Sequence, residues 1–503
     1  MCSAFIKQII GQGLTNECFS EIILPAMAKE YKFLINGRWR QSSKKEDVKN
    51  PYNNKTIAQV CYAEERDLED AVISSQKAFE ITKKAPAYKR AEILQNIVHG
   101  LEQRLEEIAR TITLEAGKPI VDSRNEVKRA INTFQIASEE AKRIEGEVIP
   151  LDLTQGSENR FGIVRRFPIG PILGITPFNF PLNLVAHKVA PAIASGNTII
   201  LKPALKTPIT ALILGEIVTD AGLPSGGLNV IPCSNPLAEK LVTDERIKKL
   251  SFTGSAAVGM KLKAMAGMKK VTLELGGNAG VIVHSDANVD FAAQRCTVGA
   301  FSYAGQICIS VQRIYVQKDI YGEFVERFLS NVKNLRQGDP MDESTNIGPM
   351  IEEEASKRTE TWLRDAVNSG AKVLIGGNRK GIFFEPTILS NVKPSMKVCS
   401  DEVFAPMVTV ERYEQFEDAV SMINNSLYGL QAGVFTSDIK NIFYAYNELE
   451  VGGVIANDIP TYRMDHMPYG GVKMSGFGRE GIKYALEEMT ELKLLAINPN
   501  DQA

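Results

Sequence analysis

The sequence contains few of the residues that bind metals or form disulfides, and this scarcity excludes several kinds of site. Its 503 residues include four histidines and seven cysteines. The cysteines are odd in number, scattered, and show neither CxxC spacing nor a Cys/His ligand pattern. This usage argues against a disulfide framework and against a zinc site, and it is typical of a reduced, cytoplasmic protein. We therefore expect no metal centre.

Long apolar runs and an excess of charge of one sign are also missing. No run reaches the roughly 20 apolar residues that cross a bilayer. The net charge is -2 at pH 7, which gives no electrostatic reason to expect a nucleic-acid or membrane partner. Residues 1–28 are mildly apolar but carry Lys7, Glu17 and Glu21, and they show no signal-peptide layout. We expect them to form an N-terminal extension.

What the sequence does contain is an alternation of strand-like and helix-like segments. Between residues 172 and 284, short apolar stretches such as "NTIILKP" and "KLSFTGS" alternate with helical patterns. Such alternation indicates βαβ units, in which helices cover both faces of a parallel sheet and ligands bind at the carboxyl ends of its strands. The pattern repeats after Cys308, and a chain of this length needs more than one core. The fold class is therefore α/β, with a second α/β domain.

Three local features add detail to this organisation. Apolar residues recur at three- and four-residue steps across residues 93–112, which predicts an amphipathic helix. Thr207 is expected to cap a helix whose first residue is Pro208. Residues 151–170 alternate between polar and apolar around a turn. This alternation predicts a projecting hairpin that pairs with another subunit or with the strand at residues 490–498.

The stretch "FSYAGQICIS" (Phe301–Ser310) raises the first question of chemistry. Cys308 lies among small and uncharged residues, after a helical pattern that ends near Tyr303. A free cysteine is most often a buried core residue, but a thiol on a loop could act as a nucleophile. Gly305 is expected to keep such a thiol approachable. The stretch by itself leaves both interpretations open.

Other motifs follow strand ends, and each is ambiguous alone. "FTGSAAVG" (Phe252–Gly259) could hold a phosphate at a helix start or form a tight turn. Glu274 in "LELGGNAG" could be a general base with a raised pKa or a salt-bridged strand residue. Asn179 in "GITPFNFP" could stabilise an oxyanion or form an Asx turn. Lys202 could reach a nucleotide or stay solvated, and Glu402 could clamp a ribose or face outward from a strand edge.

The order of these motifs is more informative than any one of them. The chain shows "PFNFP", "KPALKTP", "FTGS", "LELGG", "GQIC", "EVFAP" and "PYGGVKMSGFGREG" in one sequence. This order resembles the aldehyde dehydrogenase superfamily, and the resemblance covers the chain from about Lys29 to Ile497. It implies the family fold, with a Rossmann-like nucleotide-binding domain at 29–150 and 171–274, an α/β catalytic domain at 275–480, and a small β oligomerisation arm at 151–170 and 481–503.

The resemblance also implies a role for each motif. Cys308 is similar to the family nucleophile, Glu274 to the general base, and Asn179 to the oxyanion donor beside the Cys308 backbone N–H. The thiolate would attack an aldehyde carbonyl, hydride would pass to a nicotinamide, and water activated by Glu274 would release the acid. Lys188 and Glu480 match positions that relay protons. The cofactor contacts match Thr176, Pro177, Phe178, Lys202, Leu205, Gly254, Ser255, Val258, Leu275, Glu402 and Phe404.

One cofactor position departs from the pattern of family members that prefer NAD. Those members often carry a glutamate three residues after the lysine that matches Lys202, and here that residue is Leu205. Leucine can neither accept the hydroxyl hydrogen bonds of the adenine ribose nor repel a 2′-phosphate. Lys202, together with Lys206, could meet such a phosphate. The cofactor implied is therefore NADP or NAD, with NADP accepted.

The substrate side of the resemblance points to a small polar or anionic aldehyde. Arg129 and Arg463 match substrate-channel positions, and similar arginines bind phosphate in the non-phosphorylating glyceraldehyde-3-phosphate dehydrogenases. Related arginines serve phosphonoacetaldehyde enzymes, and similar sequences include archaeal lactaldehyde dehydrogenases. Phe180 and Ile307 also match this channel, and Ile307 stands where phosphate-type enzymes can carry a third arginine. Two guanidinium groups suit an anion or several oxygens.

Several alternatives stay open at this point. Arg129 and Arg463 could be paired only with Glu126 and Asp465. The chain could be a CoA-acylating semialdehyde dehydrogenase, although Glu274 favours hydrolysis, or a catalytically silent structural protein on the same fold. A cysteine hydrolase agrees less well with the sequence, because no histidine lies in a motif that suggests pairing with the thiol. The expected partners are a small aldehyde and a second copy of the chain, in a homodimer or homotetramer.

Overall fold

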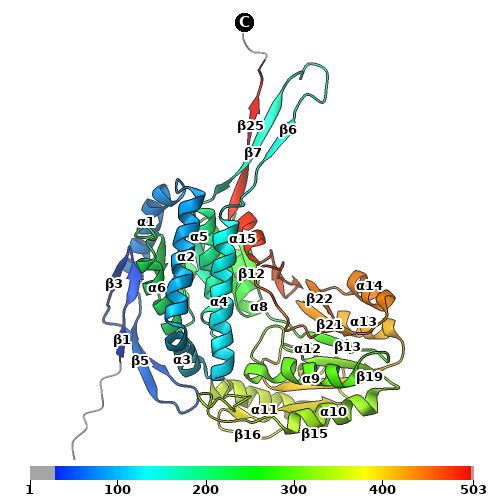
Figure 1. Cartoon of the computed structure of the whole chain (residues 1–503). Helices are drawn as coiled ribbons and strands as arrows, with labels where there is room; N and C mark the ends of the chain where they lie inside the picture. The colour runs from blue at the N-terminus through cyan, green and yellow to red at the C-terminus, as the bar shows by residue number, and fades with distance from the viewer. Residues whose placement is uncertain (1–28, 500–503) are drawn as a thin grey trace, which may run out of the picture.

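The computed structural model describes residues 29–499, and Figure 1 shows two sheet-based units side by side with an arm projecting from them. The extension expected at residues 1–28 lies outside the described residues. Within residues 29–499, none of the helices is both long and apolar enough to span a membrane.

The first unit is built on an eight-stranded sheet, which confirms the predicted βαβ organisation. Its order is β24 (Gly476–Phe477), β12 (Lys270–Glu274), β11 (Lys249–Thr253), β8 (Pro171–Ile175), β9 (Thr198–Lys202), β10 (Leu228–Val230), β2 (Phe33–Ile35) and β3 (Arg38–Arg40). Strands β12 to β10 are parallel, whereas β24, β2 and β3 run antiparallel to their neighbours. Strands β8 to β11 are buried along their whole length because helices cover both faces.

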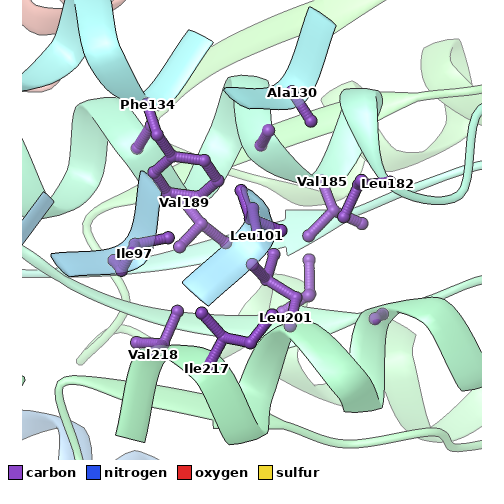
Figure 2. Packing of buried hydrophobic residues seen from close by; sticks show 14 of the residues in the cluster. Ile97, Leu101, Ala130, Phe134, Leu182, Val185, Val189, Leu201, Ile217 and Val218 are labelled. Atoms are coloured by element: carbon purple, nitrogen blue, oxygen red, sulfur yellow. The ribbon is translucent and has the colours of Figure 1, made fainter. Parts of the chain in front are cut away.

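In the first unit some helices pack directly on this sheet, and others pack on those helices. They are α1 (Glu65–Thr82), α2 (Ala87–Gln103), α3 (Leu105–Ala116), α4 (Ile120–Glu140), α5 (Asn183–Ser195), α6 (Ile209–Asp220), α7 (Asn235–Thr243), α8 (Ala256–Met265) and α15 (Ile482–Glu488). Figure 2 shows side chains of α2, α4, α5 and α6 meeting Leu201 of β9 in one cluster. Helix α5 is buried along its whole length.

The apolar repeat over residues 93–112 belongs to two helices, not one. Its apolar positions are buried as predicted, but the chain bends between α2 and α3 at Arg104, where φ is -106° and ψ is 16°. The Arg104 side chain donates to Glu107 of α3 and to Glu216 of α6. One of these two partners, Glu216, comes from a helix that is distant in sequence, so the local repeat could not reveal this contact.

The backbone N–H groups at the start of α6 are not capped by the residue that the sequence predicted. Its N-cap residue is Pro208, and the side chain of Thr207 donates instead to the carbonyl of Phe178. The buried carboxylate of Glu115, from α3, accepts the backbone N–H groups of Ile209 and Thr210. A helix start can be satisfied by any acceptor that the fold brings close, and here that acceptor is distant in sequence.

The second unit is built on a seven-stranded sheet that lies beside the first. Its order is β15 (Lys372–Ile375), β18 (Thr387–Ser390), β19 (Met407–Tyr413), β14 (Arg313–Gln317), β13 (Gly280–Val283), β21 (Gln431–Phe435) and β22 (Gly453–Ala456). Only β15 is antiparallel within this sheet. The accompanying helices are α9 (Val289–Phe301), α10 (Tyr321–Lys333), α11 (Glu353–Asn368), α12 (Lys397–Ser400), α13 (Phe416–Asn424) and α14 (Ile439–Glu448).

The arm is a three-stranded sheet that projects away from both units (Figure 1). Strand β7 (Phe161–Pro168) pairs with β6 (Glu147–Pro150) and, along its full length, with β25 (Thr490–Ile497). The predicted pairing with the C-terminal strand is thus confirmed, although the hairpin begins four residues before residue 151. Helix α15, which precedes β25, packs on α4 and α5.

Three small sheets complete the described chain. The first contains β1 (Lys29–Tyr31), β5 (Thr56–Cys61) and β4 (Lys45–Lys49), the second β16 (Arg379–Lys380) and β17 (Phe383–Phe384), and the third β20 (Tyr428–Gly429) and β23 (Val472–Lys473).

Candidate active site

Cys308 lies where two cavities meet between the two units. It follows α9 and a short 3-10 turn at Ser302–Gly305, so it lies on a loop as the sequence predicted. The cavity on one side has a volume of about 280 Å³, and the cavity on the other about 240 Å³. Cys308 lines both of them and is half-buried, which makes it accessible from two directions.

The turn before Cys308 has an unusual backbone. Tyr303, Ala304 and Gly305 have φ angles of 48°, 53° and 68°, all in the left-handed region. A Cβ atom on Gly305 would lie 2.3 Å from the carbonyl oxygen of Ala405. Glycine is therefore required for close packing of this turn. The buried amide of Gln306 then fixes the loop, because its oxygen accepts the backbone N–H of Ile351.

Asn179 is tied directly to the Cys308 loop. It follows β8, and its side-chain nitrogen donates to the carbonyl of Gln306 over 2.9 Å. An amide nitrogen carries two hydrogens, so one N–H stays available for a ligand in the cavity that Asn179 and Cys308 both line. Burial keeps water from competing with that donor, since Asn179 is 3% exposed.

Glu274 ends β12 in the same cavity as Cys308 and Asn179. Both of its carboxylate oxygens are buried without a hydrogen-bond partner, so the salt-bridge alternative does not describe it. Burial raises the pKa of this carboxyl well above its ordinary value, and the charge of Glu480 raises it further. A carboxylate that is buried and unpartnered is a strong proton acceptor.

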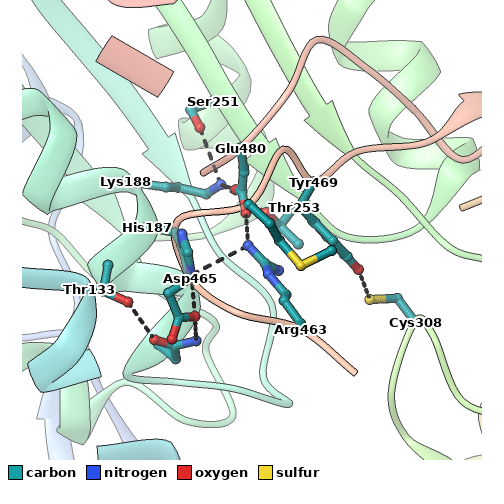
Figure 3. A network of polar contacts seen from close by, with 12 residues as sticks. Thr133, His187, Lys188, Ser251, Thr253, Cys308, Arg463, Asp465, Tyr469 and Glu480 are labelled. Atoms are coloured by element: carbon teal, nitrogen blue, oxygen red, sulfur yellow. Dashed lines mark hydrogen bonds and ion pairs between the residues drawn. The ribbon is translucent and has the colours of Figure 1, made fainter. Parts of the chain in front are cut away.

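The Cys308 thiol has a neighbour that the sequence did not reveal. The hydroxyl oxygen of Tyr469 lies 3.1 Å from the sulfur, and Figure 3 shows this contact beside Arg463. Burial raises the pKa of the thiol to about 11, and the hydrogen bond with Tyr469 acts in the opposite direction. The resting group is therefore a neutral thiol that needs a base to become a nucleophile.

The cavity of about 280 Å³ combines glycines, aromatic rings and two carboxylates, those of Glu274 and Glu402. The rings of Phe178 and Phe404 meet edge to face with centroids 6.0 Å apart. Glu402 accepts the backbone N–H of Gly277, and a Cβ on Gly276 would lie 2.2 Å from its carboxylate. Of the predicted cofactor residues, this cavity brings together Pro177, Phe178, Gly254, Ser255, Leu275, Glu402 and Phe404.

The other predicted cofactor residues lie outside the lining of this cavity. Thr176 and Lys202 are buried at the carboxyl ends of β8 and β9, Leu205 is half-buried, and Val258 is exposed on α8. The Lys202 ammonium donates to Asn235 over 3.1 Å. Lys206, which we expected beside a 2′-phosphate, forms an ion pair with Glu352.

The cavity of about 240 Å³ is charged, and it includes all four predicted substrate residues, Arg129, Phe180, Ile307 and Arg463. Arg129 donates to Asp465 over 2.7 Å, as the ion-pair alternative expected. Arg463 instead pairs with Glu480 over 3.1 Å, and Glu126 pairs with Lys118. The Nε atoms of Arg129 and Arg463 are both buried without a hydrogen-bond partner, so each guanidinium retains an unused donor.

Behind these arginines lies a buried network of charges, drawn in Figure 3. Lys188 donates to Glu480 over 3.1 Å, which joins the two residues that matched proton-relay positions. Burial opposes ionisation of Glu480, but Lys188 and Arg463 lower its pKa to about 2. His187 contacts both Asp465 and Arg463. The network therefore holds both arginines in fixed positions.

Sequence reasoning missed three residues of the site. Tyr469 lies within the "PYGG" motif, but its contact with the thiol depends on a distant loop. Lys118 lies 3.6 Å from the centroid of the Phe180 ring and is fully buried, and no sequence pattern distinguishes it from an exposed lysine. Asp465 was considered only as a partner of an arginine, whereas it also contacts His187 and Asn183.

Comparison with known proteins connects this geometry to a family. The chain matches the aldehyde dehydrogenase family over residues 39–495. It is 46% identical over 471 residues to 3-sulfolactaldehyde dehydrogenase of Priestia aryabhattai, which covers 93% of this chain and 98% of the relative.

Two solved structures have the same fold. Aldehyde dehydrogenase 21 from Physcomitrella patens, in complex with the reaction product succinate, is similar with a TM-score of 0.93 and 46% identity, covering 95% of this chain and 100% of that one. Glyceraldehyde-3-phosphate dehydrogenase from Methanocaldococcus jannaschii, complexed with NADP, is similar with a TM-score of 0.87 and 39% identity, covering 91% of this chain and 100% of that one.

Proposed function

The chain belongs to the aldehyde dehydrogenase family, and we propose that it oxidises a small aldehyde with a terminal anion to the carboxylic acid, with NADP or NAD as cofactor. The observation that carries this proposal is the position of Cys308. It lines a cavity that contains Asn179 and Glu274 on one side and a cavity that contains two arginines on the other.

The cavity of about 280 Å³ fits the nicotinamide end of the cofactor. Gly276 lets the Glu402 carboxylate lie against the backbone, where a Cβ would clash with it, and a planar ring can lie against Phe178 and Phe404. Glu402 is the group that would hold a ribose hydroxyl, and Ser255 and the first turn of α8 would face a phosphate. When bound, the oxidised nicotinamide accepts the hydride that converts the thiohemiacetal carbon to a thioester.

The residues of the chain supply the remaining chemistry in two steps. Cys308 loses its proton to a base, attacks the aldehyde carbon, and forms a C–S bond while the carbonyl oxygen becomes an alkoxide. The free N–H of Asn179 and the Cys308 backbone N–H stabilise that oxygen. In the second step, Glu274 takes a proton from water, the resulting hydroxide attacks the thioester, and the thiolate leaves.

The unpartnered carboxylate of Glu274 supports water, not CoA, as the group that releases the acyl product. A thiol such as CoA ionises more easily than water. Acyl transfer to CoA therefore depends less on a buried base than hydrolysis by water does. Neither carboxylate oxygen of Glu274 has a hydrogen-bond partner in the protein. Glu274 can therefore take a proton only from a bound molecule.

Leu205 supports acceptance of NADP. A hydrophobic side chain at this position cannot accept both hydroxyls of the adenine ribose, and it removes a charge that would repel a 2′-phosphate. The nearby cation is Lys202, since Lys206 is engaged by Glu352. The related enzyme from Methanocaldococcus jannaschii was solved with NADP, which is consistent with this assignment.

The arginines support the substrate class. Arg129 and Arg463 each have an unpartnered Nε donor in the cavity of about 240 Å³, and guanidinium groups bind sulfonate, carboxylate and phosphate oxygens well. The named relatives act on sulfolactaldehyde and glyceraldehyde 3-phosphate or yield succinate. Each of these molecules is small and ends in an anion.

Replacing Arg463 with Leu tests the substrate class. We expect KM for an anionic aldehyde such as succinic semialdehyde to rise about 10- to 100-fold, because a buried charge-assisted hydrogen bond is lost. KM for a neutral aldehyde of the same length, such as butanal, should stay within about threefold. NADPH formation with each aldehyde gives both values.

Arg463→Lys is the matched control, because it keeps the charge that neutralises Glu480 but loses the planar fork of donors. It should fall between the wild type and Arg463→Leu for the anionic aldehyde. Equal losses for charged and neutral aldehydes in Arg463→Leu would contradict an anion-binding role.

The projecting arm supports assembly of two or four copies of this chain. Leu492, Leu494 and Leu495 of β25 are exposed on it, as are Val148 and Phe161 of the neighbouring strands. Exposed apolar side chains on a projecting sheet are typical of a subunit interface.

We place the protein in the cytoplasm, where its reduced cysteines would persist. Within each subunit, β24 and α15 support assigning part of the C-terminal region to the nucleotide-binding domain.

A further inference from the structure

The hydroxyl of Tyr469 contacts the proposed nucleophile from outside its own loop. Its oxygen lies 3.1 Å from the Cys308 sulfur. The ring and Cys308 both line the cavity of about 240 Å³ that contains Arg129 and Arg463, which we call the substrate-side cavity. Tyr469 is 2% exposed, so water does not compete for this contact. A neutral thiol can be either donor or acceptor here, but a thiolate can only accept.

The position of the Tyr469 ring is fixed from several sides. Its backbone N–H donates to the carbonyl of Glu480, and its carbonyl accepts the N–H of Glu480. The guanidinium carbon of Arg463 lies 3.6 Å from the ring centroid, and Ile309 and Leu430 pack beside the ring. A hydroxyl held this rigidly loses little entropy when it forms a hydrogen bond.

We propose that Tyr469 is a positioning residue for the reaction: its O–H donates to the Cys308 thiolate and holds the sulfur at the junction of the two cavities. The donation favours the ionised thiol over the neutral one. Once the sulfur has bonded to the aldehyde carbon it is a poor acceptor, so the hydroxyl stabilises the free nucleophile more than the intermediate. This inference rests on the proposed role of Cys308.

The other charged groups facing the thiol act in both directions. Glu402 and Glu274 lie on the cofactor side and disfavour the thiolate, whereas Arg463 on the substrate side favours it. Tyr469 is the group among these that contacts the sulfur by a hydrogen bond. Its removal should therefore change the ionisation of the thiol without changing any formal charge around it.

Tyr469→Phe in the full-length enzyme tests the inference, because Phe keeps the ring and removes only the hydroxyl. The rate of alkylation of Cys308 by iodoacetamide is followed against pH by mass spectrometry of the Cys308 peptide. Thiolate absorbance at 240 nm gives a second titration after subtraction of Cys308→Ser. We expect the midpoint to rise by about one pH unit, and the alkylation rate at neutral pH to fall about tenfold.

Tyr413→Phe is the matched control, because it removes another buried tyrosine hydroxyl, one that contacts His284 in the second unit. It should titrate as the wild type. A Tyr469→Phe enzyme that titrates as the wild type, or that loses its fold, assigns Tyr469 to packing alone and overturns the inference. If Cys308→Ser retains dehydrogenase activity, the proposed function fails instead, whatever Tyr469→Phe does.

Discussion

The two cavities that meet at Cys308 are built in different ways. The cofactor-side cavity, of about 280 Å³, is lined by glycines, a pair of aromatic rings and the carboxylates of Glu274 and Glu402. The substrate-side cavity, of about 240 Å³, is lined by apolar side chains and by charged ones from distant segments, of which Lys118, Arg129 and Arg463 form ion pairs. The first cavity depends on steric fit, and the second depends on charge. Changes to the two should therefore have different signatures.

Among the substitutions that distinguish the two cavities, Glu274→Gln should reduce activity the most. Without the base, thioester hydrolysis should slow about 10²- to 10⁴-fold. The first turnover should still release NADPH, because neither the thiol nor either cavity has lost its shape. Rapid-mixing measurement of NADPH formation should show a burst followed by a slow steady state.

The pH dependence of the wild type provides a second readout of Glu274. The base must be deprotonated to act, and burial raises its pKa, so steady-state turnover should fall as pH drops through that raised value. Glu274→Gln should lack this acidic limb. Glu411→Gln is the control, because burial also raises the pKa of that distant carboxyl. The assignment would fail if Glu274→Gln hydrolysed the thioester at the wild-type rate.

Gly276→Ala should alter the cofactor-side cavity alone. The added methyl would lie 2.2 Å from a Glu402 oxygen, and overpacking of this kind costs roughly 1–3 kcal/mol. We therefore expect NADP affinity, measured by calorimetry, to fall about 5- to 150-fold. Alkylation of Cys308 should change little. Gly322→Ala, where the added methyl meets open space, should bind NADP normally, and an equal loss there would point to a global effect.

Leu205→Glu should have the smallest effect on activity, because it changes the preference between NADP and NAD and leaves the catalytic residues intact. The new carboxylate can accept the ribose hydroxyls of NAD and repels the 2′-phosphate of NADP. The ratio of kcat/KM for NADP to that for NAD should fall about 10-fold or more. Leu205→Gln adds an acceptor without the charge and should shift the ratio less. An unchanged ratio would show that Leu205 does not face the adenine ribose.

Several features of the fold could be predicted from the sequence because they depend on neighbouring residues. Strands β8 and β9 and the start of α8 follow from apolar runs and turn residues within a few positions. The loop position of Cys308 follows from the end of the helical pattern near Tyr303. The break between α2 and α3 did not follow, because Arg104 is fixed by Glu216 of another helix.

The sequence by itself determined the α/β class, the order of the motifs and the identity of Cys308, Glu274 and Asn179 as candidates for chemistry. The class follows from the alternation of strands and helices, and the three candidates follow from the order of motifs that resembles the family. Only the tertiary structure decided which groups meet: Tyr469 with the thiol, Arg463 with Glu480, and Glu115 with the start of α6. None of these pairs is formed by neighbouring residues, and burial makes such contacts strong only after folding has excluded water from them.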